Sequence, residues 1–257
     1  MKQRILTAAL ALIILIPLII FGGLPFILGV YVFAIIGLYE LMRMYSHDKG
    51  IQYVLVSIIF LCMWMYPGKL PFEINGNDIF LVFLIILLAF TVLAKNKFNF
   101  DDAGFVLIAT AYIGISFQAL IDTRMAGLDY LLFILFIIWA TDSGAYFVGK
   151  YFGKRKLWPE ISPNKTIGGA LGGILFALVT GSIFHLVSPL DYSFVSIVGI
   201  TVLISVVGQI GDLVASAMKR HYQVKDSGKI FPGHGGILDR LDSLLFVLLM
   251  LKLIHFV

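Results

Sequence analysis

The stretch from Gly211 to Ser243 reads GDLVASAMKRHYQVKDSGKIFPGHGGILDRLDS and lies between two long apolar runs. It holds four aspartates and five lysines or arginines, in a chain in which only 13% of the residues are charged. Charged side chains at a membrane boundary are costly unless they are paired, hydrated or bound to a ligand. Carboxylates can hold a divalent metal, and cations with exposed glycine amides can hold phosphate. The stretch therefore predicts two helix ends and a loop that form a metal and nucleotide site at a membrane face.

The composition of the whole chain indicates a membrane protein. Hydrophobic residues make up 60% of the 257 residues, and charged residues make up only 13%. In a typical soluble domain, about a quarter of the residues are charged. The apolar runs are continuous rather than alternating, which argues against an outer-membrane barrel. The single cysteine, Cys62, excludes a disulfide framework within one chain. We therefore expect an all-α, polytopic integral membrane bundle.

The apolar runs predict about nine transmembrane helices, since each span needs about 20 apolar residues. The expected spans are 5–21, 24–42, 51–67, 79–94, 103–121, 128–149, 167–187, 194–216 and 237–256. We expect one integral membrane domain over residues 1–257, with N-terminal spans in 1–121 and catalytic C-terminal spans in 128–257.

The distribution of lysine and arginine orients these spans. When the loops are assigned alternately to the two sides, sixteen of the 19 basic residues fall on the side of the N-terminus. Cytoplasmic loops carry an excess of basic residues. This pattern predicts a cytoplasmic N-terminus and places the charged stretch at the cytoplasmic face.

The aspartates of the stretch have spacings that predict a shared site. Asp212 lies late in the eighth span and Asp239 early in the ninth, so both are expected near the same interface. Asp239 and Asp242 are three residues apart and share a helix face, and Asp212, Ser216 and Lys219 recur at helical spacing. Converging carboxylates suit Mg²⁺, which also binds substrate phosphates.

The alternative for these aspartates is a structural role. Asp239 or Asp242 would then pair with Arg240 or Arg220 and bind no ligand.

Asp142 is an ionisable residue inside the sixth expected span. Such a residue usually has a function and faces the bundle interior. The alternative is a polar hydrogen bond between helices, to which Thr141 and Ser143 are also suited.

Two loops carry further candidates. In Ser162-Pro-Asn-Lys-Thr166, Pro163 suits an early helix position with Ser162 as the cap, and Lys165 would then project where anions bind. In Pro232-Gly-His-Gly-Gly236, the glycines would let backbone amides approach an anion before the ninth span. The alternatives are a plain helix cap and an ordinary turn.

A stripe of small residues at every fourth position marks a packing face on the seventh span. Its members are Gly169, Gly173, Ala177 and Gly181. Both a dimer contact and an internal contact are consistent with it.

The polar motifs, taken in order, resemble the signature of the phosphatidate cytidylyltransferase family, also called CDP-diacylglycerol synthases. They are Ser216-Ala-Met-Lys-Arg220, Lys225-Asp226 and His234-Gly-Gly-Ile-Leu-Asp-Arg-Leu-Asp242. The Asp142-Ser143 span and the Ser162–Thr166 segment are similar to that family too, so the resemblance covers essentially the whole chain. One departure is Gly168, where many members carry an acidic residue.

The resemblance implies the reaction CTP + phosphatidate → CDP-diacylglycerol + pyrophosphate. It implies dependence on Mg²⁺, with a second cation allowed, and a place in the bacterial cytoplasmic (inner) membrane. The implied partners are CTP, phosphatidate, the lipid bilayer and a second copy of the chain in a homodimer, with no nucleic acid.

The resemblance also implies that the metal-binding aspartates are Asp212 and Asp239, and we expect Asp242 and Asp142 as further ligands or orienting groups. Catalytic roles are expected for Asp212, Asp239, Lys219 and Arg240. Substrate binding is expected at Ser162, Asn164, Lys165, Thr166, Ser216, Arg220, Lys225, Asp226, His234, Gly235 and Gly236.

Two other functions are consistent with these features. A CTP-dependent lipid kinase would transfer the γ-phosphoryl group instead of the CMP moiety. An ion-coupled transporter would use Asp142 and Asp212 as ligands near the midplane, although the charge is concentrated at one face and no inverted repeat is evident.

Overall fold

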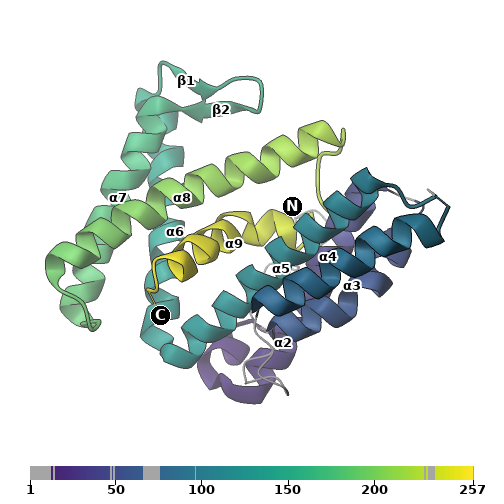
Figure 1. The fold of residues 1–257 in the computed structure, drawn as a ribbon. Coiled ribbons are helices and arrows are strands. Elements are labelled where there is room, and N and C mark those ends of the chain that lie inside the picture. The colour runs from purple at the N-terminus through teal and green to yellow at the C-terminus, as the bar shows by residue number, and fades with distance from the viewer. Residues whose placement is uncertain are drawn as a thin grey trace. The chain divides into compact units, whose positions relative to one another are not determined.

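The computed structural model describes residues 13, 15–46, 48, 50–65, 76–95, 97–228, 230 and 235–256. Most of this part of the chain is helical (Figure 1). The helices are α2 (Gly23–Tyr45), α3 (Gly50–Met65), α4 (Gly76–Leu93), α5 (Phe100–Ala126), α6 (Leu128–Phe152), α7 (Ile167–Val187), α8 (Phe194–His221) and α9 (Leu238–Leu253). A short antiparallel hairpin of β1 (Lys156–Trp158) and β2 (Ser162–Thr166) connects α6 to α7.

Six helices in the described ranges are long and apolar enough to cross a membrane, namely α2, α4, α5, α6, α7 and α8. The expected class, a polytopic helical membrane protein, is therefore confirmed. The bounds of α7 equal those of the expected span. Helix α8 continues five residues beyond its expected end, so Lys219 lies in the last helical turn rather than in a loop. Of the first expected span, 5–21, the structure describes only a part, in which residues 15–21 are helical.

The chain divides into two compact units. The first unit contains the described residues up to Asp122 and those from Asp226 to Leu238. The second unit contains Thr123–Lys225 and the residues from Asp239 onward. The polypeptide therefore leaves the second unit after Lys225 and re-enters it at Asp239, in the first turn of α9.

Aromatic contacts and a polar cluster around Asp102 hold helices of the first unit together. The rings of Phe60 and Phe83 are stacked with centroids 4.2 Å apart. Tyr45 stacks on Phe105 at 4.2 Å and its hydroxyl donates to Asp102 Oδ1 at 2.9 Å. Asp102 in turn accepts from the backbone N–H of Asn99 at 3.0 Å, and this bond closes the N-terminal turn of α5.

The second unit depends on a close approach of α6 and α7. A Cβ atom built at Gly173 would lie 2.8 Å from the carbonyl oxygen of Thr141, and one at Gly144 would lie 2.7 Å from Cβ of Phe176. Farther along α7, a Cβ at Gly181 would collide with Thr201 of α8. Glycine lets two helix backbones pack in direct contact. The small-residue stripe on α7 therefore serves contacts within this chain.

The span of α7 is as expected, but the predicted cap, Ser162, is wrong by four residues. Ser162 and Pro163 lie in strand β2, which pairs with β1 in the register Trp158↔Ser162. The cap of α7 is instead Thr166, whose backbone is extended (φ −127°, ψ 153°) and whose Oγ1 accepts the N–H of Gly169 at 3.0 Å. Proline disfavours a helical conformation of the residue before it, and it also suits an edge strand.

The glycine contact predicts a matched pair of stability effects. Gly173→Ala should lower the free energy of unfolding by about 1–3 kcal/mol, because its methyl group must displace the backbone of α6. Gly199→Ala, with no atom within 4 Å of the added Cβ, should change stability by no more than about 1 kcal/mol. Melting temperatures of the two variants in detergent test this. Equal melting temperatures would contradict the described packing.

Candidate functional site

Helices α8 and α9 pack together and carry charged residues of the predicted site, among them Asp212, Lys219, Asp239 and Asp242. A Cβ atom at Gly211 would lie 2.7 Å from Cβ of Phe246 and 3.1 Å from the carbonyl oxygen of Asp242. Only a residue without a side chain permits this distance. Because Gly211 precedes Asp212, the close approach brings the carboxylates of Asp212 and Asp242 near enough to repel each other electrostatically.

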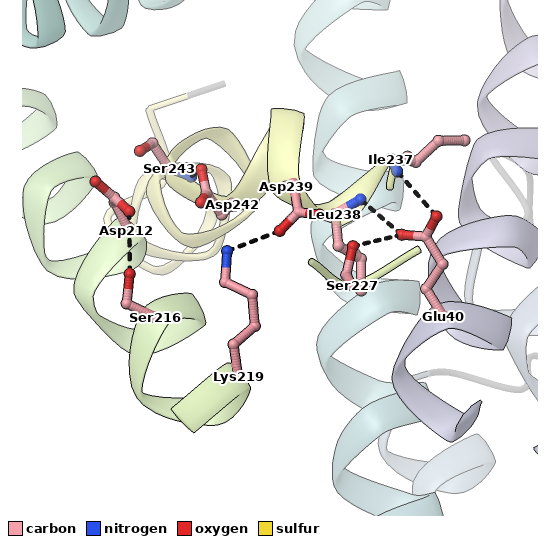
Figure 2. Close-up of polar contacts among 10 residues, drawn as sticks. All are labelled: Glu40, Asp212, Ser216, Lys219, Ser227, Ile237, Leu238, Asp239, Asp242 and Ser243. Carbon is pink, nitrogen blue, oxygen red and sulfur yellow. Dashed lines mark hydrogen bonds and ion pairs between the residues drawn. The ribbon is translucent and has the colours of Figure 1, made fainter. Parts of the chain in front are cut away.

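The first charge pair joins the end of α8 to the start of α9. Lys219 Nζ lies 2.7 Å from Asp239 Oδ1, and the side chains are only 18% and 8% exposed (Figure 2). A lysine in the last helical turn and an aspartate in the first are both favoured by the helix dipole. The sequence predicted that carboxylates converge at these helix ends, whereas the contact that the structure shows there joins a lysine to a carboxylate.

The second charge pair joins the β-hairpin to α8. Lys165 Nζ, at the end of β2, lies 2.6 Å from Asp212 Oδ2. The same ammonium group donates to the carbonyl oxygen of Gln209 at 3.3 Å. On the other oxygen of Asp212, Ser216 Oγ donates at 3.5 Å, which is a weak bond. Lys165 therefore pairs with Asp212, as Lys219 pairs with Asp239.

Asp142 lies on α6 within electrostatic range of this second pair. Its interactions with Asp212 and Lys165 are repulsive and attractive, respectively. Its own side chain is exposed, whereas the neighbouring Thr141 is buried and donates to Ser205 Oγ at 2.9 Å. The polar bond between helices that the sequence allowed for is thus made by Thr141, and Asp142 remains available to a ligand.

The aspartates offer the oxygen donors that Mg²⁺ prefers, but they do not form a closed cage. In the described ranges, no three aspartate, glutamate, histidine or cysteine side chains lie close enough to hold a metal by themselves. Mg²⁺ usually keeps several waters and binds one or two carboxylates together with substrate phosphates. The donor set therefore fits a metal that is bound jointly by the protein and a phosphate ligand.

The remaining predicted residues have varied positions. Asn164, Arg220, Lys225, Asp226 and Arg240 are exposed, Ser162 is half-buried, and Thr166 is the buried cap of α7. Gly235 has a φ of 85°, a left-handed conformation that favours glycine. Asp226, Gly235 and Gly236 belong to the first unit. His234 lies outside the described residues.

One buried acidic residue was missed by the sequence analysis. Glu40 of α2 is 2% exposed, and its carboxylate accepts the backbone N–H groups of Ile237 and Leu238, each at 3.0 Å (Figure 2). The signal was present, because an acidic residue in an apolar span is a candidate for function. The signal was overlooked because Glu40 is far in sequence from the charged stretch Gly211–Ser243, on which the prediction of the site was based.

Comparison with known proteins agrees with the motifs quoted above. A model of the cytidylyltransferase family matches residues 2–257. A phosphatidate cytidylyltransferase of Bacillus subtilis (strain 168) is 49% identical over 255 residues, which are 96% of this chain and 95% of that protein. Proteins with the same name from Staphylococcus saprophyticus and Staphylococcus haemolyticus are 44% and 43% identical, over 99% of this chain and 98% of theirs.

These matches extend over nearly the full length of this chain and of each relative, so they concern the whole chain rather than one motif. The resemblance inferred from residues 216–242 is thereby confirmed. The chain belongs to the cytidylyltransferase family, and within it to the phosphatidate cytidylyltransferases.

Proposed function

We propose that this protein transfers the CMP moiety of CTP to phosphatidate, giving CDP-diacylglycerol and pyrophosphate. Relatives that bear the name of this activity cover nearly the whole chain. The observation that carries the proposal is the pairing of Lys165 with Asp212 and of Lys219 with Asp239 in one unit. Lys165, Lys219 and Asp239 lie in the segments on which the family resemblance rests, and Asp212 lies four residues before Ser216, where the first of these motifs begins.

The reaction joins two anions. A phosphate oxygen of phosphatidate attacks the α-phosphorus of CTP and forms the new P–O bond. The bond from the α-phosphorus to the oxygen bridging to the β-phosphorus breaks, and pyrophosphate leaves with the electron pair. The attacking oxygen is already ionised near neutral pH, so the main barrier is charge repulsion. Catalysis is then mostly positioning and charge neutralisation.

The two lysine–aspartate pairs are suited to this task. In the absence of substrate, each lysine neutralises a carboxylate that would otherwise be costly in an apolar bundle. Incoming phosphates compete for Lys165 and Lys219, because ammonium groups bind phosphate strongly. The lysines then hold the phosphates, and the carboxylates become available to a cation.

Mg²⁺ would be held by Asp212 and Asp239, with Asp242 and Asp142 as further ligands. This ion, and a second cation where present, would neutralise phosphate charge when bound. Arg240 on α9 and the exposed Arg220 and Lys225 are assigned to the triphosphate or the lipid phosphate. Asn164, Ser216 and Asp226, with His234 and its glycines, complete the proposed substrate contacts.

The proposed arrangement in the membrane has nine spans, a cytoplasmic N-terminus and the site at the cytoplasmic face of the bacterial inner membrane. The distribution of lysine and arginine supports this orientation. It gives the site access to cytoplasmic CTP, while phosphatidate enters sideways from the lipid. We also propose that the protein is a homodimer, as the family resemblance implies.

The function predicts a specific transfer of label. The purified chain in detergent–phosphatidate micelles, with Mg²⁺ and CTP labelled at the α-phosphate, should place the label in the lipid phase and release an equal amount of pyrophosphate. EDTA should abolish both. The measurement is the ratio of lipid label to pyrophosphate.

The same assay separates the alternatives. A lipid kinase would transfer label only from the γ-phosphate and release CDP, and a transporter would move solute across liposomes without covalent change. Lipid labelled from the γ-phosphate, or no labelled lipid with active wild-type protein, would contradict the proposal.

Removing one carboxylate charge tests the assignment of the aspartates. Asp212→Asn and Asp239→Asn should each reduce kcat on the order of 10³-fold, the scale on which a group that stabilises transition-state charge acts. Asp129→Asn, an exposed acidic residue in the first turn of α6, should keep wild-type activity. Melting temperatures check that all three variants are folded. Normal turnover of either site variant would refute its role.

The packing of α8 on α9 gives an independent test. Gly211→Ala places a methyl group against Phe246 and Asp242, so it should separate the helices that carry the aspartates and lower kcat roughly 10-fold or more, since small misplacements in a site are costly. Gly208→Ala, one turn earlier, makes ordinary contacts with Val247 Cγ2 at 3.5 Å and Ser243 Cβ at 3.9 Å, and it should remain active. Equal activities of the two variants would exclude this role for the glycine.

A further inference from the structure

We propose that Glu40 is a positioning residue for the cytidylyl transfer, because its carboxylate fixes the N-terminus of α9 and thereby the place of Asp239. The inference rests on the proposed function and deepens it. It concerns a residue of the N-terminal half of the chain, almost 200 positions before the helix that it holds.

The contacts of Glu40 are made with both carboxylate oxygens. Oε1 accepts the backbone N–H of Ile237 at 3.0 Å. Oε2 accepts the backbone N–H of Leu238 at 3.0 Å and the hydroxyl of Ser227 at 2.8 Å. All of these residues belong to the first unit. Three donors from one loop and helix start therefore converge on a single buried side chain.

The loop is built to admit this carboxylate. A Cβ atom at Gly228 or at Gly236 would collide with the carboxyl group of Glu40. Ser227 and Gly236 are buried, and Glu40 itself is 2% exposed. The absence of a side chain at these two glycines thus leaves room for the carboxyl group of Glu40. Gly236 has this packing role in addition to any phosphate contact expected from the sequence.

The position of these donors explains how Glu40 acts on the site. Ile237 and Leu238 directly precede Asp239, so their N–H groups are among those that an α-helix leaves unsatisfied at its start. A carboxylate at this end is favoured by the helix dipole. Asp239 directly follows Leu238 in the backbone of α9, and its own carboxylate binds Lys219.

The chemistry requires a carboxylate rather than an amide. In Glu40→Gln, one of the two oxygens becomes an NH₂ group, which is a donor. Whichever way the amide is turned, its NH₂ faces at least one backbone N–H that formerly donated to an oxygen. The substitution keeps the size of the side chain and removes part of the clamp, so it isolates the hydrogen bonds from the packing.

The test compares purified wild-type protein with Glu40→Gln and Ser227→Ala, and uses Asp78→Asn as the control. Asp78 is an exposed acidic residue in the first turn of α4, also in the first unit. Hydrogen–deuterium exchange of the peptide that contains Ile237 and Leu238 reports the clamp. The kinetic readouts are kcat, KM for CTP and the Mg²⁺ concentration for half-maximal rate.

Glu40→Gln should speed exchange at Ile237 and Leu238 and lower kcat roughly 10–100-fold, the range found when a group that orients a metal ligand is removed. The KM for CTP should change less than about 3-fold, and the Mg²⁺ requirement should rise, because a misplaced Asp239 weakens the cation site. Ser227→Ala should shift the same readouts in the same direction by less, and Asp78→Asn should shift none.

A purely structural role gives a different result. It would reduce the amount of folded protein but leave kcat per folded molecule and the Mg²⁺ requirement unchanged, and that outcome would overturn the proposal. Altered kinetics without faster exchange would overturn it too. If Glu40→Gln does not fold, Ser227→Ala decides by the same readouts. Wild-type protein that forms no CDP-diacylglycerol would instead refute the proposed function, and the exchange data would still report the contact.

Discussion

A carboxylate inside an apolar helix bundle is stable only when cations or hydrogen-bond donors compensate its charge. This chain meets that requirement in two ways. Asp212 and Asp239 are each paired with a lysine at 2.6–2.7 Å, whereas Glu40 is satisfied by backbone N–H groups and a serine hydroxyl. The lysine–aspartate pairs can be opened, because a phosphate can bind the lysine while a cation binds the carboxylate. The backbone N–H groups that bind Glu40 are fixed in the helix start, so this contact suits a permanent structural support.

The acidic residues therefore differ in role: Asp212 and Asp239 are suited to bind ligands, and Glu40 is suited to support the start of α9. Asp212 lies on α8 and Asp239 in the first turn of α9, and Gly211 lets the backbones of these two helices approach closely. Asp142 adds a third carboxylate from α6 that interacts with the Lys165–Asp212 pair. In the proposed reaction, two phosphate-bearing substrates would bind to such adjacent charges of both signs, and each lysine–aspartate pair would neutralise its own charges until the substrates bind.

Much of this was predictable from the sequence, and the reasons are physical. The apolar runs indicated the class and the bounds of α7, because a membrane span must be long and apolar. Helical spacing placed Asp212, Ser216 and Lys219 together. The cap of α7 was predicted wrongly, because Ser162-Pro163 suits a helix start as well as an edge strand, and only pairing with β1 decides between them. Which lysine pairs with which aspartate, and the reach of Glu40 to Leu238, depend on tertiary contacts that no local pattern encodes.

The most direct test of the account is a cryo-EM structure of the protein with Mg²⁺, phosphatidate and a non-hydrolysable CTP analogue. The account predicts that the triphosphate and lipid phosphate contact Lys165 and Lys219, that both lysine–aspartate pairs are broken, and that Asp212 and Asp239 face the cation. Phosphates bound elsewhere, with the two pairs intact at their present distances, would contradict it.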